Sequence, residues 1–133
     1  MRAFPLKIVT PDGSFFDGMA ESITVRTVGG DVGIMAGHAD FVTALGMGQA
    51  RVVMDGKARK ASCIGGMLRV SNGTVTVVAT TFEWAENIDI ERAEKSAERA
   101  RTVLQNKASH TSEEIALAEA RLKRALVRTG TAQ

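Results

Sequence analysis

The sequence predicts an α+β protein, with an N-terminal all-β sandwich of about ten short strands followed by a C-terminal antiparallel hairpin of two helices. Residues 4–84 contain many short β-forming runs that turn signals separate. After residue 85, Ala, Glu, Arg and Leu replace the strand residues. Residues 87–128 then repeat apolar positions with the period of a helix. We therefore expect two domains, residues 1–85 and residues 86–133.

Turn signals place the strands of the first domain. Pro11-Asp12-Gly13-Ser14 ends the first run, Asp55-Gly56 is a strong two-residue hairpin signal, and Ser71-Asn72-Gly73 is another. Prolines occur only before residue 12, so none disrupts a later strand. Strands are expected at residues 4–9, 15–19, 21–27, 41–45, 49–54, 57–64, 67–70, 74–80 and 82–84.

Capping residues place the two helices. Asp89 can cap the first helix, with Ile88 and Ala93 as a hydrophobic staple pair. Thr111 and Glu114 form a capping box for the second helix. The apolar stripes are Ala93, Ala97, Ala100 and Leu104 on the first helix, and Ile115, Ala118, Leu122 and Ala125 on the second. The short polar turn at residues 106–111 makes the helices antiparallel.

Several arginines of the hairpin lack acidic neighbours along their own helix. Lys95, Arg101 and Lys123 have Glu three or four residues away, where opposite charges support a helix. No Asp or Glu occupies those positions around Arg99, Arg121, Arg124 and Arg128. One interpretation is a solvated basic face, favoured near a helix C-terminus. The other is a polyanion site, because guanidinium groups bind phosphate in bidentate fashion.

Composition narrows the protein class. The chain has 133 residues, 44% of them hydrophobic, and a formal charge of +2, as expected for a globular protein without a basic nucleic-acid-binding arm. Its single cysteine, Cys63, excludes an internal disulfide and indicates a reducing compartment. No apolar run is long enough for a membrane span, and the N-terminus lacks a signal-peptide core. We expect a cytosolic protein.

Residues 29–40 form the densest glycine stretch of the chain. A phosphate-binding loop needs a helix N-terminus or the GxxxxGK[ST] pattern, and neither is present. We expect sharp turns at the end of the sandwich instead. His38 has no second histidine nearby and no cysteine partner, so it is expected to be a turn histidine bonded to backbone.

The same stretch resembles a known family. Gly33-Ile34-Met35-Ala36-Gly37-His38-Ala39, followed by Thr43-Ala44-Leu45 and later by Ile64-Gly65-Gly66, is similar to the epsilon subunit of bacterial F-type ATP synthases. The hairpin turns and the final helices match that family in order. Ala36 and Asp40 stand where the family usually has proline, and Arg69 stands where glutamate is common.

The resemblance implies a non-catalytic rotor subunit of the central stalk. Such a subunit couples proton translocation to ATP synthesis and restrains ATP hydrolysis. Its sandwich would contact the gamma subunit and the c-ring, with Gly33, Gly37, His38 and Ala39 as partner-binding positions. Its helical hairpin would contact the alpha/beta catalytic ring when extended. The protein would lie on the cytoplasmic face of the bacterial cell membrane, reach the membrane only through the complex, and bind no nucleic acid.

The resemblance also implies that ATP is a regulatory ligand rather than a substrate. Members that bind ATP carry Ile/Leu-Asp-x-x-Arg-Ala, which Ile88-Asp89-Ile90-Glu91-Arg92-Ala93 matches. Glu83 matches an acidic position of the pocket, and Arg99, Arg124 and Arg128 match its basic positions. The implied ATP-binding residues are Glu83, Ile88, Asp89, Arg92, Ala93, Arg99, Arg124 and Arg128, with no metal ligand.

Two other classes of function fit the sequence less well. A free-standing nucleic-acid-binding β-barrel would need aromatic stacking platforms, but the chain has no tyrosine, and its five phenylalanines and one tryptophan are not clustered with Lys or Arg. An enzyme would need paired carboxylates, metal-ligand spacing or a nucleophile with its base. Cys63 has only Lys60 as a basic neighbour. Neither class is favoured.

Overall fold

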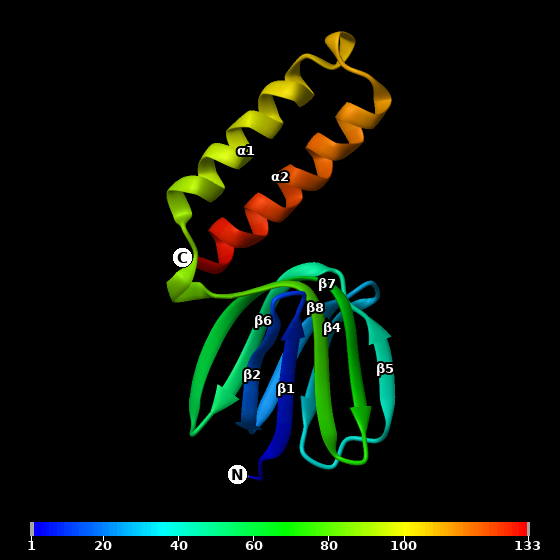
Figure 1. The fold of residues 1–133 in the computed structure, drawn as a ribbon, viewed down its shortest axis with the longest axis vertical. Coiled ribbons are helices and arrows are strands. Elements are labelled where there is room, and N and C mark those ends of the chain that lie inside the picture. Colours follow the sequence, from blue (N-terminus) through cyan, green and yellow to red (C-terminus); the bar gives the residue numbers. More distant parts are fainter. Residues whose placement is uncertain (1, 133) are drawn as a thin grey trace. The chain divides into compact units, whose positions relative to one another are not determined.

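The computed structural model describes residues 2–132, which form two compact units. The first unit ends at Trp84 and consists of strands, and the second begins at Ala85 and consists of helices (Figure 1). The boundary expected from the sequence lies one residue later. The sandwich and the helical hairpin predicted from the sequence are confirmed as the fold class.

The β unit contains eight strands within one continuously paired sheet, ordered β2-β1-β8-β7-β6-β3-β4, with β5 paired to β7. Neighbouring strands are antiparallel except β1 and β8, which are parallel. The strands are β1 (Phe4–Thr10), β2 (Gly13–Ala20), β3 (Ser22–Thr27), β4 (Gly30–Met35), β5 (Phe41–Ala44), β6 (Met47–Met54), β7 (Lys57–Ser71) and β8 (Thr74–Trp84).

Two long strands explain why eight strands are found where about ten were expected. The sequence predicted a break in the middle of β7, but β7 continues through Gly65 and Gly66 and changes partner there. Before them it pairs with β6, and after them with β5. Both glycines have positive φ, 69° and 108°, which L side chains rarely adopt. The predicted break is therefore a bend, and β8 pairs with β7 in the same register on both sides of it.

Strand β4 corrects a second expectation. Residues 30–35 were expected to form sharp turns, yet they pair in full with β3, and Gly33 lies opposite Thr24. Ile34 is fully buried. Glycines weaken the local strand signal, but the backbone hydrogen bonds offered by β3 stabilise an extended conformation that local propensity does not favour.

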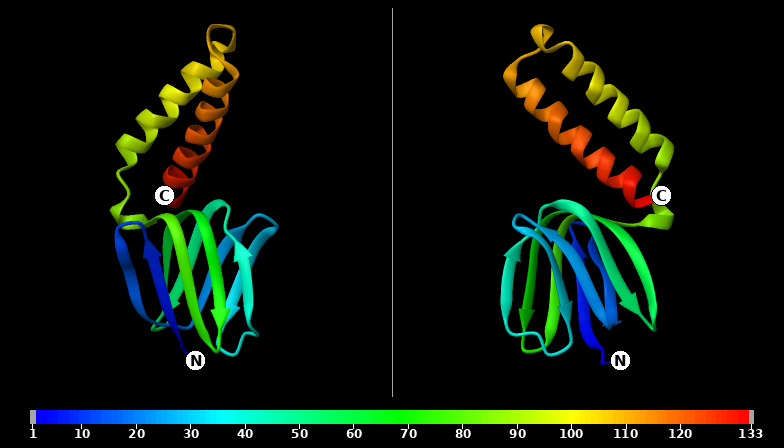
Figure 2. Two further views of the ribbon diagram at one scale, coloured as in Figure 1. Left: turned by 45° about the vertical axis from the view of Figure 1, so that its right-hand side comes forward. Right: turned by 180° about the vertical axis from the view of Figure 1, so that it is seen from behind.

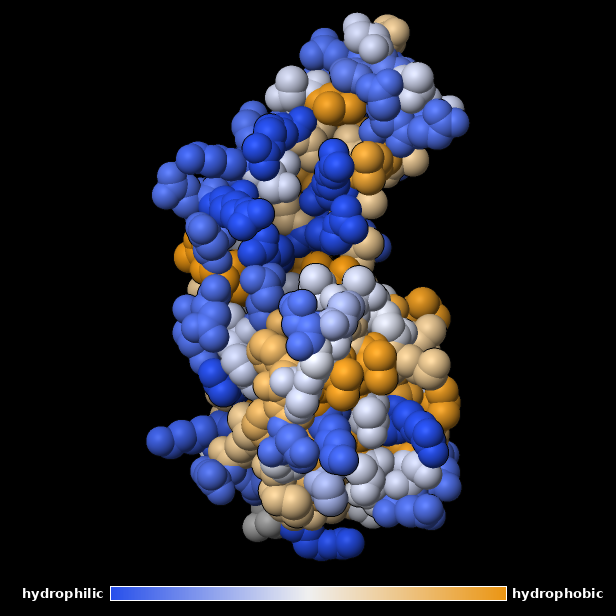
Figure 3. Space-filling view, viewed as in Figure 1, coloured by the Kyte–Doolittle hydropathy of each residue, from blue (hydrophilic) through white to orange (hydrophobic). Residues whose placement is uncertain are grey.

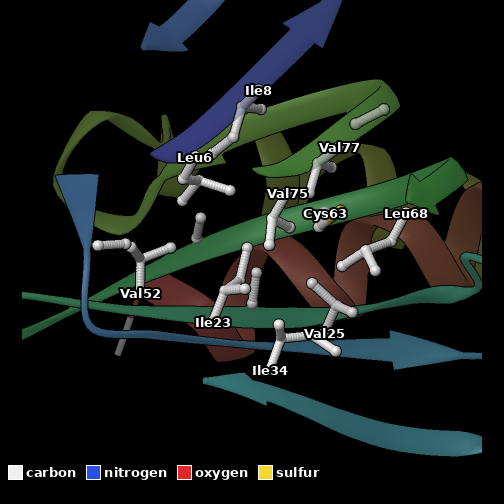
Figure 4. Close-up of a cluster of buried hydrophobic side chains, with 14 of the residues drawn as sticks. Leu6, Ile8, Ile23, Val25, Ile34, Val52, Cys63, Leu68, Val75 and Val77 are labelled. Carbon is white, nitrogen blue, oxygen red and sulfur yellow. The ribbon is translucent and has the colours of Figure 1, made fainter. Parts of the chain in front are cut away.

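The core of the β unit is mainly aliphatic, with Phe4, Phe82 and Trp84 as its aromatic members. Figure 4 shows side chains from opposite strands pointing toward one another in this cluster. Its largest members with no exposed surface are Leu6, Ile8, Ile23, Val25, Ile34, Val52, Leu68 and Val77. Burying each such side chain contributes about 1.5–3 kcal/mol. Cys63 belongs to the same core, where burial raises the pKa of its thiol to about 12. A thiol that stays protonated is a poor nucleophile.

The second unit is an antiparallel helical hairpin whose two helices lie side by side in both views of Figure 2. Its elements are η1 (Ala85–Asn87), α1 (Ile90–Gln105), η2 (Lys107–Ser109) and α2 (Ser112–Ala132). The predicted caps are confirmed. The side chain of Asp89 accepts a hydrogen bond from the Arg92 N–H at 3.0 Å. Thr111 Oγ1 accepts from the Glu114 N–H at 3.1 Å, and Glu114 Oε1 accepts from the Thr111 N–H at 3.3 Å.

Small residues line the contact between the helices. We call the buried alanines of the two helices the alanine seam: Ala93, Ala97, Ala100, Ala118 and Ala125. The larger members of the predicted stripes, Leu104, Ile115 and Leu122, are only half-buried. Alanine side chains permit close approach of two helices but each buries little apolar surface. None of the helices within residues 2–132 is long and apolar enough to cross a membrane.

Candidate functional site

The first turns of α1 surround an open hollow of about 460 Å³. We call it the N-terminal hollow. Its lining residues come from one stretch of helix, with Asp89 as the cap and the others spaced around the next three turns. They are Asp89, Glu91, Arg92, Lys95 and Arg99. The hollow therefore unites three of the basic and acidic residues that the sequence assigned to ATP: Asp89, Arg92 and Arg99.

The charges in this hollow are not balanced. Lys95 forms an ion pair with Glu91 at 3.1 Å, and Asp89 accepts a hydrogen bond from the backbone at the helix N-terminus. The guanidinium groups of Arg92 and Arg99 make no ion pair or hydrogen bond with any residue between 2 and 132. A helix N-terminus also carries partial positive charge. The hollow is therefore suited to an anionic ligand.

A second hollow of about 420 Å³ lies between α1 and α2. We call it the interhelical hollow. Its floor is apolar, and one arginine from each helix borders it. The lining residues are Ser96, Arg99, Ala100, Val103, Glu114, Leu117, Ala118 and Arg121. Arg99 thus belongs to both hollows. On the face shown in Figure 3, hydrophilic side chains cover most of the hairpin and hydrophobic ones lie between them.

Among residues 2–132, Glu114 supplies the only carboxylate that borders the interhelical hollow, and this carboxylate is already engaged. Glu114 Oε2 accepts a hydrogen bond from His110 Nδ1 at 2.8 Å, and Oε1 accepts from the Thr111 N–H. The hydrogen bond from His110, followed by those of Thr111, holds the pKa of Glu114 below its ordinary value. Glu114 therefore caps α2 and forms no ion pair with Arg99 or Arg121.

The other two arginines of α2 lie elsewhere. Arg124 and Arg128 share the helix face of Arg121 by their spacing and are half-buried, but neither borders either hollow. Arg128 takes part in an interaction within the structure, so its lack of an acidic neighbour along the helix does not leave it free. Their assignment to ATP remains a prediction.

Three further assigned residues have no side chain in the hollows. Ile88 and Ala93 are buried, and Ala93 belongs to the alanine seam. Their side chains thus serve packing, and only their backbone is available to a ligand. Glu83 lies in β8, opposite Ser62 of β7, and belongs to the other compact unit. Its assignment to ATP also remains a prediction.

Ser96 was not predicted as a site residue, and Arg121 was predicted only as one of four arginines of a possible polyanion site, not as an ATP-binding position. Asp89, Arg92, Ser96 and Arg99 follow at intervals of three or four residues, so helical periodicity places Ser96 on the arginine face of α1. Arg121 was noted as lacking an acidic neighbour but matched no family position. Only the pairing of α1 with α2 brings it to the same hollow as Arg99.

The predicted partner-binding positions of the β unit fall on a strand and a turn. Gly33 lies inside β4, whereas Gly37 has a φ of +82° in the turn that follows. His38 Nδ1 donates to the carbonyl of Ala39 at 2.7 Å, which confirms a turn histidine bonded to backbone. Its ring packs edge-on against Phe41, with the centroids 5.7 Å apart. Their contact with a partner stays a prediction.

Each departure from the family pattern has a local role. The side chain of Asp40 accepts a hydrogen bond from the Asn72 N–H at 3.0 Å and so connects two turns. Ala36 packs against the core, and Arg69 donates to Ser71 Oγ at 3.5 Å. Asp40 therefore supplies a connection between turns that a proline side chain could not.

The structure corrects the expectation that no aromatic residue clusters with Lys or Arg. The Arg59 guanidinium lies 4.0 Å from the Trp84 ring centroid, because the pairing of β7 with β8 places them close together. The rings of Phe15 and Phe82 contact each other and the Trp84 ring. Phe82 and Trp84 are buried, however, so their rings provide no open platform for stacking bases.

No group of three or more His, Cys, Asp or Glu side chains within residues 2–132 is arranged to hold a metal ion. The two arginine-lined hollows contain Arg92, Arg99 and Arg121, whose side chains lack partners among residues 2–132. Their guanidinium groups can bind an anion and balance its charge.

Comparison with protein families matches both units. Residues 3–85 match the family described as ATP synthase, Delta/Epsilon chain, beta-sandwich domain. Residues 86–133 match the family described as ATP synthase, Delta/Epsilon chain, long alpha-helix domain. Together the two matches span nearly the whole chain.

Individual proteins show the same similarity. The chain is 39% identical over 133 residues to an ATP synthase epsilon chain of Ruminococcus albus, covering 99% of this chain and 98% of the relative. It is 39% identical over 132 residues to that of Bacillus velezensis, with the same coverage of 99% and 98%.

Solved structures extend the comparison. A chain in the cryo-EM structure of the Euglena gracilis mitochondrial ATP synthase, OSCP/F1/c-ring, superposes with a TM-score of 0.86 at 25% identity, over 98% of this chain and 82% of that one. A chain in the Tetrahymena thermophila mitochondrial ATP synthase central stalk and c-ring has a TM-score of 0.63 at 15% identity, covering 97% and 96%. The second likeness concerns the fold alone.

Proposed function

The chain belongs to the family of ATP synthase epsilon subunits, non-catalytic components of the central stalk, and we therefore propose that it couples proton translocation to ATP synthesis and restrains ATP hydrolysis with ATP as its effector. In this proposal ATP binds the helical hairpin and favours its closed form. The hairpin separates and extends when ATP falls.

The N-terminal hollow carries the ATP proposal. The motif Ile88–Ala93 starts α1, and its Asp89 and Arg92 border this hollow together with Arg99. Two guanidinium groups without partners among the described residues face a site next to a helix N-terminus. Both features favour phosphate oxygens.

We assign the ligand contacts accordingly. Arg92, Arg99, Arg124 and Arg128 would bind the phosphates. Asp89, Glu83 and the backbone near Ile88 and Ala93 would contact the nucleoside. Because arginines rather than a carboxylate-held metal would neutralise the phosphates, ATP binding should depend little on magnesium.

The partners follow from the family. The β unit would contact the gamma subunit and the c-ring through the turn that holds Gly37, His38 and Ala39, together with Gly33. The extended helices would place their basic face against acidic parts of the alpha/beta catalytic ring. With these contacts the protein would lie on the cytoplasmic face of the bacterial cell membrane, attached through the complex.

A calorimetric titration of the full chain with ATP tests the ligand. Removing the guanidinium in Arg92→Ala or Arg124→Ala should weaken binding by about 1.5–3 kcal/mol, the range for a hydrogen bond to a charged group. Arg101→Ala is the matched control, because Arg101 pairs with Glu98 at 3.5 Å and borders neither hollow. Affinity equal to that of the parent in both test variants would place the site elsewhere.

Hydrolysis by the assembled enzyme tests the regulation. Deleting residues 87–133 should raise ATP hydrolysis at low ATP and change it little at high ATP, while the complex still assembles. Hydrolysis that stays the same at every ATP concentration would show that the hairpin does not restrain the enzyme.

A further inference from the structure

We propose that Arg99 and Arg121 form a phosphate-binding site in the interhelical hollow, in addition to the ATP-binding positions of the family motif. Arg121 belongs to none of those positions. If the bound group is the terminal phosphate of ATP, this inference rests on the proposed function. If it is an inorganic anion, the site does not depend on ATP binding.

Charge is the first observation. Arg99 and Arg121 come from different helices and border one hollow of about 420 Å³. Neither side chain makes an ion pair or hydrogen bond with any residue described in the structure. The bordering carboxylate, Glu114, is held by His110 and Thr111. Two like charges therefore share a hollow in which Glu114, the one bordering acid among residues 2–132, is engaged by other groups, and a bound anion would relieve their repulsion.

The position of Arg121 argues against a merely solvated basic face. Cations are favoured in the last turn of a helix, where the carbonyl groups are unsatisfied. Arg121 lies in the middle of α2 (Ser112–Ala132), and Arg99 precedes the last turn of α1 (Ile90–Gln105). The helix dipole therefore stabilises neither charge.

The lining of the hollow fits a phosphate group. Two guanidinium groups can each donate a bidentate pair of hydrogen bonds to phosphate oxygens. Ser96 adds a hydroxyl donor on the same face of α1. The floor contains Ala100 and Ala118, both buried, so part of the hollow is shielded from water and charge interactions there are stronger.

Arg99 links the two hollows. It borders the N-terminal hollow with Asp89 and Arg92, and the interhelical hollow with Arg121. A nucleotide seated at the first hollow would direct its last phosphate toward the second. Arg121 would then contribute to the preference for ATP over ADP rather than to nucleotide binding in general.

Calorimetry of the full chain with ATP, ADP and inorganic pyrophosphate tests the site. Arg121→Gln should weaken ATP and pyrophosphate binding about tenfold or more and ADP binding less than threefold. Arg101→Gln, which removes an arginine paired with Glu98, should leave all three unchanged. Arg121→Lys should restore only part of the affinity, because an ammonium group cannot bind in bidentate fashion. Far-UV circular dichroism verifies that the variants keep their helices.

The possible outcomes separate the two proposals. If ATP binds the parent chain and Arg121→Gln binds all three probes equally well, this inference is wrong and the proposed function stands. If pyrophosphate binds through Arg121 but ATP does not bind, the anion site stands and the ATP proposal is wrong. If no probe binds the parent chain, both are wrong.

Discussion

Replacing Ala97 by leucine should separate the two helices of the hairpin. Ala97 is 2% exposed and lies in the middle of the alanine seam. Leucine has nearly the helix propensity of alanine, so α1 itself should persist. Its larger side chain has to fit between closely packed helices, and overpacking of this kind costs about 1–3 kcal/mol.

The structure indicates that such a loss is large for the hairpin. Each methyl group of the five-residue seam contributes about 0.8 kcal/mol on burial, about 4 kcal/mol in all. The expected loss is therefore a substantial part of what the seam supplies. A ligand that binds only the closed hairpin adds about 2.7 kcal/mol at a hundredfold excess over its Kd. ATP should thus restore much of the closed form.

Hydrogen exchange of the amides of α1 and α2 in the full chain measures this effect. Ala97→Leu should lower their protection without ATP and regain it with ATP. Ala116→Leu is the matched control, because Ala116 is exposed on α2 and leucine there meets no partner helix. Unchanged protection in Ala97→Leu would refute the role of the seam. ATP that binds the variant without restoring protection would refute the closed form as the ATP-bound one.

Two further predictions concern the bend in β7 and the start of α2. Backbone strain at a positive φ costs about 1–3 kcal/mol for a residue with a side chain. Gly66→Ala should lower the free energy of unfolding by more than this amount, because the added Cβ would also overlap the carbonyl oxygen of Val78. Gly13→Ala, at a similar φ of +112° in open space, should show the strain alone in urea unfolding, and equal losses would exclude the overlap. The lowered pKa of Glu114 means that its contribution to hairpin stability is present above the ordinary value of 4.5 and is lost as pH falls through the lowered pKa. Glu114→Gln keeps the capping box but removes the titrating carboxylate. The helical circular dichroism of this variant should therefore lose the acid dependence. A pH profile equal to that of the parent would show that Glu114 is not the group responsible.

The sequence by itself determined the features that depend on neighbouring residues. The starts of both helices were predictable because Asp89 bonds the backbone of Arg92, and Thr111 bonds that of Glu114, three residues away in each case. The hairpin turn at Asp55-Gly56 was predictable for the same reason, since its two residues have the positive φ that this dipeptide favours.

Only the tertiary structure decided the features that depend on pairing between distant segments. Strand β4 exists because β3 supplies its hydrogen bonds, although its glycines favour turns. Strand β7 remains one strand because β6 and β5 each pair with a part of it. Local propensity does not include the hydrogen bonds that a distant strand supplies, so the sequence pattern could not predict these strands.

The candidate site shows the same division. Helical periodicity placed Asp89, Arg92 and Arg99 on one face of α1, because three- and four-residue intervals are a local property. The meeting of Arg99 with Arg121 depends on the register between two helices, which the packing of the alanine seam sets. Many registers share the same apolar periodicity, and close packing of side chains selects one of them.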